Sequence, residues 1–215
     1  VQLLQPSLYE MGKRETHRTS SEFEEGDLVL IWSYFAWLVY REKLFGRQAK
    51  IDDTFRMLQE ELLPEYRISY HTNLFDALFD IANGKIYGTF HEQFLEFLVA
   101  NVFYHASLYK RDPYPEFLRY VVRPEINRYF RAIWKEGSED DKEKIATNIF
   151  EQYLYNVGSD DNTSVAVRVH AIYHVSRLAC AEQGERLKRA FNIEKHISVR
   201  LSLFFGAIKR GQLDK

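Results

Sequence analysis

His170 and His174 have the spacing that two metal ligands on one helix would have. Residues four apart lie on the same helical face, and imidazole is a common metal ligand. No carboxylate accompanies them in the patterns typical of zinc or di-iron sites, so His71, His105 or a distant acid would have to complete the site. We therefore predict no metal site and no cofactor. The sequence leaves open whether these four histidines converge in the fold.

Two arginine–histidine pairs could instead carry acid–base chemistry on RNA. Arg168 with His174 and Arg189 with His196 have a spacing that resembles the Arg-x4–6-His pattern of the HEPN-type helical ribonucleases. That resemblance implies a dimer in which the histidine moves a proton at the RNA 2′-hydroxyl and the arginine holds the scissile phosphate. The residue after each arginine is apolar, where that family usually has a polar one, and a chain with seven histidines contains such pairs by chance. A metal-independent ribonuclease is therefore the alternative function, with Arg168 and His174 as its catalytic residues.

The segment 109–135 combines cations with aromatic rings. It has seven basic and three acidic residues, interleaved with tyrosines, phenylalanines and Trp134. Cations that pair with phosphates, beside rings that stack on bases, are what binding to single-stranded nucleic acid needs. On an amphipathic helix, however, such rings face the core and the arginines face water. Nucleic-acid binding is therefore a further alternative. The candidate residues for contact with nucleic acid or a partner protein are Arg119, Arg123, Arg128 and Arg131.

Other catalytic patterns are missing from the sequence. It contains no glycine-rich dinucleotide loop, no P-loop and no G-x-S-x-G nucleophile motif. Its one cysteine, Cys180, stands among leucine and alanine residues, which is typical of a packed, inert thiol. No complete set of catalytic residues is therefore evident.

Charge is segregated along the chain, although the formal net charge is only −2. Residues 138–162 include seven acidic and two basic residues, whereas residues 176–215 include nine basic and four acidic residues. Tyrosine, phenylalanine and arginine, which anchor many protein interfaces, are abundant. We therefore expect a non-enzymatic helical interaction or regulatory module that recognises a protein partner, and the sequence also allows a homodimer.

The composition is that of a globular protein. Of the 215 residues, 46% are hydrophobic and 28% are charged, which excludes collagen-like, low-complexity and wholly disordered classes. One cysteine cannot form an internal disulfide and no targeting segment is visible, so we expect a cytoplasmic location. The most apolar stretch, 28–40, is shorter than the ~20 residues that a membrane-spanning helix needs. We expect this stretch to be a core helix, and no membrane span.

Hydrophobic periodicity and capping residues predict an all-α fold, a single multi-helix bundle of about seven to nine helices. We expect one helical domain over 27–215, preceded by a mobile or loosely docked arm over 1–26. Pro124 is expected to bend a helix that starts at Pro115. The other expected helices are 28–45, 52–63, 72–83, 89–112, 138–157, 164–183 and 193–209.

Overall fold

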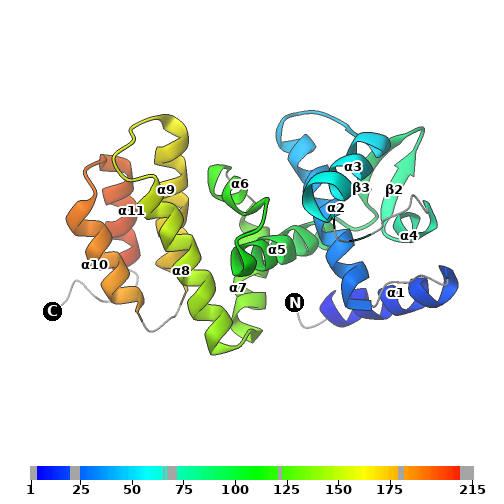
Figure 1. Ribbon diagram of the computed structural model, residues 1–215, viewed down its shortest axis with the longest axis horizontal. Helices are drawn as coiled ribbons and strands as arrows, with labels where there is room; N and C mark the ends of the chain where they lie inside the picture. The colour runs from blue at the N-terminus through cyan, green and yellow to red at the C-terminus, as the bar shows by residue number, and fades with distance from the viewer. Residues whose placement is uncertain are drawn as a thin grey trace. The chain divides into compact units, whose positions relative to one another are not determined.

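The computed structural model describes residues 4–19, 25–64, 66, 72–120, 123–178 and 182–208. Helices dominate these ranges, with one small sheet, so the prediction of an all-α fold is confirmed (Figure 1). The chain divides into two compact units, each considered by itself below. Unit 1 comprises Val1–Val102 with Arg123–Ala132, and unit 2 comprises Phe103–Val122 with Ile133–Lys215. The expected 27–215 domain includes residues of both units.

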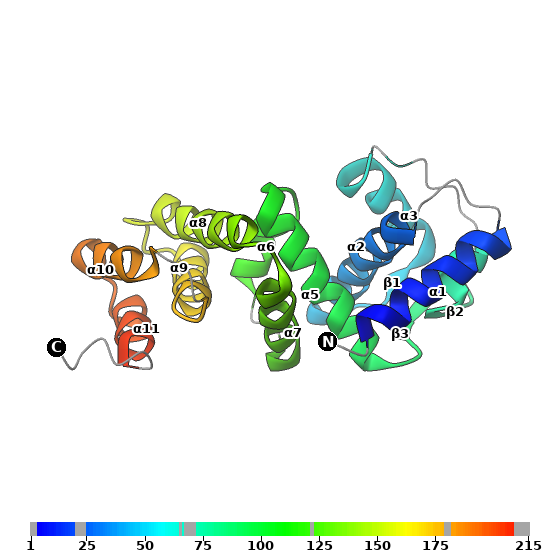
Figure 2. The same cartoon turned by 90° about the horizontal axis from the view of Figure 1, so that it is seen from below.

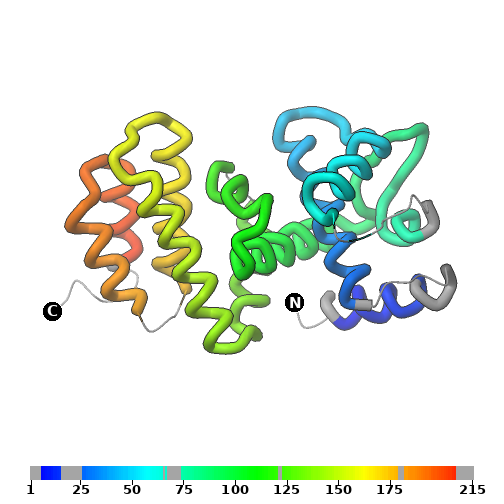
Figure 3. Tube along the Cα trace, in the orientation of Figure 1, coloured from blue at the N-terminus to red at the C-terminus, as the bar shows by residue number. Residues whose placement is uncertain are grey.

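Unit 1 is built around a long helix, α2, with shorter helices and three strands beside it (Figure 1), and Figure 3 traces the path of the same chain from its N-terminus. Its helices are α1 (Leu4–Thr19), α2 (Glu25–Leu44), α3 (Ile51–Met57), the π-helix η1 (Leu58–Leu62), α4 (Thr72–Asp76), most of α5 (Glu92–Tyr109) and most of α7 (Pro124–Glu136). Its strands are β1 (Ala49–Lys50), β2 (Phe79–Ala82) and β3 (Lys85–Thr89).

The helix α2 forms the centre of the unit 1 core, as its composition predicts. Every residue from 31 to 40 is buried, because this stretch is apolar on all faces. The buried indole of Trp32 donates a hydrogen bond to the carbonyl of Leu74, at 2.8 Å. Phe35 contacts the rings of Phe55, Phe75 and Phe79 at centroid distances of 4.5–5.3 Å. These aromatic contacts fix α3, α4 and β2 against α2.

The three strands form an antiparallel sheet in the order β1-β3-β2. This sheet corrects the expected helix over 72–83, because α4 ends at Asp76 and β2 begins at Phe79. Asn83 and Gly84 both have positive φ, at 53° and 68°, and they connect β2 to β3. A two-residue Asn-Gly connection favours the type I′ hairpin turn, and pairing with β3 then outweighs the helical spacing of the preceding residues.

Residues 4–19, within the segment expected to be a mobile or loosely docked arm, form the helix α1. Leu8 is fully buried, and α1 packs against α2. Leu8 and Met11 are three residues apart and therefore lie on one helical face. Many polar residues surround this short apolar stripe, so hydrophobic periodicity predicts the helix only weakly.

The described residues of unit 2 form helices and their connections, with no strand. Besides the ends of α5 and α7, its helices are α6 (Tyr114–Arg119), α8 (Glu139–Tyr155), α9 (Asn162–Val175), α10 (Gln183–Ile193) and α11 (Ile197–Ile208). Helix α9 packs against α6, α8 and α11, as the two views in Figures 1 and 2 illustrate. It therefore supplies the centre of this unit's core.

Several helix boundaries in unit 2 can be compared with the sequence predictions. Ser138 caps α8 as expected, accepting a hydrogen bond from the Asp141 amide at 3.1 Å. Pro124 begins α7 rather than bending a longer helix, because its ring is compatible with a first helical turn. The expected helix over 164–183 ends at Val175, and a separate helix, α10, begins at Gln183. Cys180 lies outside the described residues.

Across the described ranges, the structure contains no helix with both the length and the apolar character needed to cross a membrane.

Candidate functional site

Helix α11 has apolar side chains on two of its faces. Val199, Leu203 and Gly206 are buried, and their spacings of four and three place them on one face. Four further apolar residues repeat at spacings of four, three and one, and they are exposed to solvent. These are Ile197, Leu201, Phe204 and Phe205, with exposed fractions of 68%, 50%, 45% and 65%. We call these four residues the α11 outer face.

An apolar outer face is unusual for a helix at the surface of a soluble domain. Such helices normally present charged and polar residues to water. Between Ile197 and Ile208, Arg200 is the one charged residue. A contiguous exposed apolar patch on a protein surface usually marks a site where another molecule binds. The α11 outer face is therefore the candidate functional site.

Helix α10 extends the apolar surface next to α11. Phe191 and Ile193, at the end of α10, are also exposed. The Arg200 guanidinium lies over the Phe191 ring, 5.3 Å from its centroid, so a cation–π contact joins the two helices. The helices α10 and α11 contact one another, and both views show them as neighbours (Figures 1 and 2).

The charges near the α11 outer face are mainly positive. Glu194, between α10 and α11, is buried and faces Arg168 with a separation of 3.0 Å between its Oε2 and the arginine Nε. It therefore contributes no negative charge to the surface. Glu185 is the exposed acid of α10. The exposed cations of α10, α11 and the connection between them are Lys188, Arg189, Lys195 and Arg200.

Arg168, expected as a catalytic residue in the ribonuclease hypothesis, is almost fully buried. Its guanidinium donates hydrogen bonds to the carbonyls of Asn156, at 2.6 Å, and Ser159. Its ion pair with Glu194 lies in the same buried site. Burial and the nearby charge of Glu194 raise the pKa of Tyr153, whose hydroxyl donates to the Ala190 carbonyl at 3.3 Å. These contacts connect the loop before α9 with α10 and residue 194.

The histidines of α9 have separate partners within unit 2. His174 is buried with its ring edge-on to Phe103, at a centroid distance of 4.9 Å. The Nδ1 of His170 lies 2.8 Å from the carbonyl oxygen of Leu118. His105 contacts the ring of Tyr109, and His71 lies outside the described residues. In the described part of the chain, no group of three His, Cys, Asp or Glu residues could hold a metal ion.

The arginines of segment 109–135 are exposed to different degrees and bound differently. Arg119 is exposed in unit 2, and Arg123 in unit 1 pairs with Glu92 and Glu96. Arg128 lies over the Tyr129 ring at 5.4 Å, and Arg131 donates to the Asn127 carbonyl at 3.1 Å. The buried aromatic residues of this segment are Tyr114, Phe117, Tyr129, Phe130 and Trp134.

Burial of these rings has a direct consequence for the nucleic-acid hypothesis. Bases stack on exposed ring faces, and these five rings belong to the cores of their units. Of the other rings in the segment, Tyr109 is exposed and Tyr120 is half-buried, so the segment presents its cations with little of the accompanying stacking surface.

Sequence reasoning placed a last helix over 193–209 but did not identify the α11 outer face. The sequence does contain a pattern that indicates a second apolar face, because apolar residues occupy positions 197, 199, 201, 203, 204 and 205. This pattern covers more of the helix circumference than one buried stripe requires. A helix that is apolar on two sides is either enclosed by its own fold or available to a partner.

Comparison with protein-family models, curated protein sequences and solved structures finds no match to this chain.

Proposed function

We propose that this chain is a non-enzymatic helical interaction module that binds a partner protein through the α11 outer face. The observation that carries this proposal is the exposure of Ile197, Leu201, Phe204 and Phe205 on one side of α11. Burying such side chains at an interface removes apolar surface from water, and aromatic residues are frequent anchors of interfaces. A partner that covers this face would stabilise both the complex and the helix.

The partner segment that fits this face is an amphipathic helix with acidic residues beside its apolar stripe. An apolar stripe on one helix can pack along the stripe of another, with contacts repeating every three or four residues. Lys195 and Arg200 would then face the acidic residues. A second copy of this chain would bring the same mainly positive surface to the interface, so charge complementarity favours a different protein as the occupant.

The regulatory role and the cytoplasmic location are parts of the same proposal. An interaction module without chemistry of its own acts by controlling when or where its partner works. The single cysteine among 215 residues is compatible with a reducing compartment.

The test uses two synthetic amphipathic peptides with the same leucine stripe. One peptide has glutamates beside the stripe and the other has lysines. We expect the full chain to bind the glutamate peptide about tenfold more tightly or better, because opposite charges flank the apolar contact. Fluorescence anisotropy of labelled peptides measures both affinities.

Two variants show whether the binding occurs at the α11 outer face. Leu201→Asp combined with Phe205→Asp should abolish binding, because both substitutions place charge in the apolar contact. Tyr155→Asp is the matched control, since Tyr155 is the most exposed aromatic residue outside this face. Equal binding by both variants would refute the proposal. Sedimentation that reveals a dimer of the native chain but not of the Leu201→Asp, Phe205→Asp variant would identify a second copy as the occupant instead.

The ribonuclease and nucleic-acid hypotheses gain no specific support from the geometry. Arg168 and His174 are buried and bound to structural partners, and the rings of segment 109–135 are largely in the core. Cleavage of labelled RNA in EDTA that is lost in His174→Ala would favour the ribonuclease. Salt-dependent RNA binding that weakens in Arg119→Ala would favour the nucleic-acid module.

A further inference from the structure

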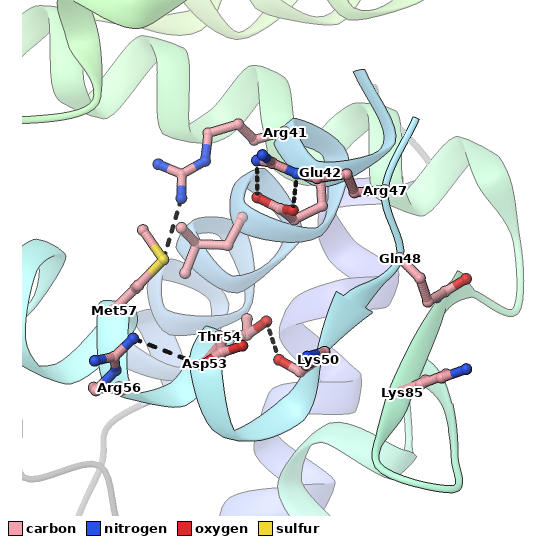
Figure 4. Close-up of a pocket in the computed structure, with 11 residues that line it drawn as sticks. Arg41, Glu42, Arg47, Gln48, Lys50, Asp53, Thr54, Arg56, Met57 and Lys85 are labelled. Carbon is pink, nitrogen blue, oxygen red and sulfur yellow. Dashed lines mark hydrogen bonds and ion pairs between the residues drawn. The ribbon is translucent and has the colours of Figure 1, made fainter. Parts of the chain in front are cut away.

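Unit 1 contains a pocket between the end of α2, strand β1, helix α3 and the start of β3 (Figure 4). Its volume is about 660 Å³, within the range of about 300–1,000 Å³ that small-molecule sites occupy. Leu38 and Met57 supply its apolar wall. The charged residues that line it are Arg41, Glu42, Arg47, Lys50, Asp53, Arg56 and Lys85.

This pocket is strongly positive. Five of its lining residues are cations and two are carboxylates, so its formal charge is +3. Both carboxylates are already paired within the pocket. Glu42 accepts two hydrogen bonds from Arg47, at 2.7 and 2.9 Å, and Asp53 lies 3.6 Å from the Arg56 guanidinium. The remaining lining cations include Lys50 and Lys85, which carry the excess positive charge on the strand side of the pocket.

Two of those cations, Lys50 and Lys85, are direct partners across the β1–β3 pair. Side chains of opposed residues project from the same face of a sheet, and like charges at such positions destabilise the pairing. Both side chains are exposed, and no described carboxylate lies within ion-pair distance of either ammonium group. An anion held between the two lysines would relieve this repulsion.

Arg41 adds a third cation at the apolar side of the pocket. Its guanidinium is half-buried, and Nη2 lies 3.2 Å from the sulfur of Met57 (Figure 4). A guanidinium has five N–H donors, so it can bind phosphate or carboxylate through two parallel hydrogen bonds beside its other contacts. This arrangement places a strong donor beside an apolar wall, which suits a ligand that has both charged and apolar parts.

We propose that this pocket binds a phosphorylated small molecule, with its phosphate groups at Lys50, Lys85 and Arg41 and its uncharged part against Leu38 and Met57. The phosphate can belong to a free organic phosphate or to the headgroup of a phosphorylated lipid, because both offer the same chemistry to these cations. This site lies wholly in unit 1 and does not depend on the α11 outer face.

Isothermal titration calorimetry of the full chain with ATP and with inorganic pyrophosphate tests the site, with uncharged adenosine as the negative ligand. We expect both phosphates to bind and adenosine not to bind. Vesicles of phosphatidylcholine with and without a phosphoinositide form the lipid arm. Binding to ATP in solution identifies a free phosphate as the source, and binding to the phosphoinositide vesicles alone identifies the lipid headgroup.

Lys50→Gln combined with Lys85→Gln should weaken binding about tenfold or more, because two charge-assisted contacts are lost. Lys135→Gln combined with Lys144→Gln removes the same charge from two exposed residues that do not line the pocket and should change binding less than about twofold, since salt screens exposed charges outside the site. Without ligand, the Lys50→Gln, Lys85→Gln variant should melt at the same temperature as the native chain or at a higher one, because the repulsion between the two lysines is removed. This measurement shows whether weaker binding results from loss of the site or from unfolding of the chain. Failure of every phosphate probe to bind, or equal weakening by the two double variants, would overturn the proposal.

Discussion

At the scale of single residues, the ion pair between Arg168 and Glu194 has the largest expected effect on stability. The two side chains are only 1% and 3% exposed, and the arginine Nε lies 3.0 Å from the glutamate Oε2. Charges in such a site are compensated by each other rather than by water. The arginine also donates to two loop carbonyls, so it fixes the backbone before α9.

Arg168→Met should lower the free energy of unfolding by about 3–5 kcal/mol, because Glu194 would remain buried without its cation. Adding Glu194→Gln should recover part of this loss, since the double variant has no uncompensated charge. Urea unfolding followed by circular dichroism measures both changes. A loss below about 1 kcal/mol in the single variant would place the pair among weak surface ion pairs and contradict this account.

Asp161 makes the stability of unit 2 depend on pH at the start of α9. Hydrogen bonds from the Ser159 hydroxyl, and then from Ser164, lower the pKa of Asp161 below its ordinary value of 3.8. A lowered folded-state pKa means that the ionised carboxylate favours folding. This contribution is present above pH 3.8 and is lost as the pH falls through the folded-state pKa.

Asp161→Asn tests this dependence, because an asparagine can still accept from the Ser164 amide but does not titrate. We expect the native chain to be more stable than this variant at neutral pH. The difference should be smaller at about pH 3 than at pH 7, because below pH 3.8 the unfolded chain binds a proton that the folded chain does not yet bind. Urea unfolding at both pH values gives the comparison. A difference that stays constant across this range would show that the charge of Asp161 does not matter.

At the scale of secondary-structure elements, α11 closely approaches the end of α9 at Gly206. A Cβ added to this buried glycine would lie 2.7 Å from the Cβ of Ser176, at the end of α9. Real side chains do not tolerate that distance, and a Cβ atom cannot move without its backbone. The glycine is therefore required by the close approach of the two segments.

Gly206→Ala should destabilise the chain by about 1–3 kcal/mol, the usual effect of overpacking, despite the better helix propensity of alanine. Adding Ser176→Gly should recover part of the loss by removing the opposing Cβ. Gly26→Ala is the control, because nothing lies within 4 Å of a Cβ at that position in α2. Thermal unfolding measures all three variants. A Gly206→Ala chain as stable as the Gly26→Ala chain would contradict the close approach.

Helix ends with local signals could be predicted from the sequence, whereas elements defined by distant partners could not. Ser138 caps α8 by accepting a hydrogen bond from the amide of Asp141, three residues later. The sequence of residues 138–141 is therefore enough to predict this helix start. Leu74, Phe75, Leu78 and Phe79 have helical spacing, but Phe79 belongs to a strand because it pairs with Thr89 of β3. The Asn83-Gly84 pair was a hairpin signal within the expected helix.

The candidate sites were predictable only in part for the same reason. Sequence spacing grouped Arg168 with His174, yet their partners come from other segments: Glu194 from the connection between α10 and α11, and Phe103 from α5. The pocket cations Lys50 and Lys85 are 35 positions apart in sequence and meet through strand pairing. The sequence of α11 has more apolar positions than one buried stripe needs, so a second apolar face could be predicted. Which of the two faces is exposed could not be predicted, because it depends on how the rest of unit 2 packs against α11.

At the scale of the whole molecule, the two leucines of α11 distinguish a core position from a position on the proposed binding face. Leu203 is 2% exposed and Leu201 is 50% exposed, although both occupy the same helix two residues apart. Leu203→Ala should therefore cost about 2–5 kcal/mol of unfolding free energy, as expected for a core truncation. Leu201→Ala should change it by less than about 0.5 kcal/mol. Equal losses in chemical unfolding would mean that the outer leucine is part of the core.

The exposed aromatic side chains of α11 also bear on how long an unbound copy would last in a cell. In cells, chaperones and proteases recognise and process proteins that expose hydrophobic segments. A copy whose Phe204 and Phe205 remain uncovered would resemble a damaged protein to that machinery. We expect its cellular half-life to lengthen when its binding partner is co-expressed, so that the two proteins accumulate in matched amounts.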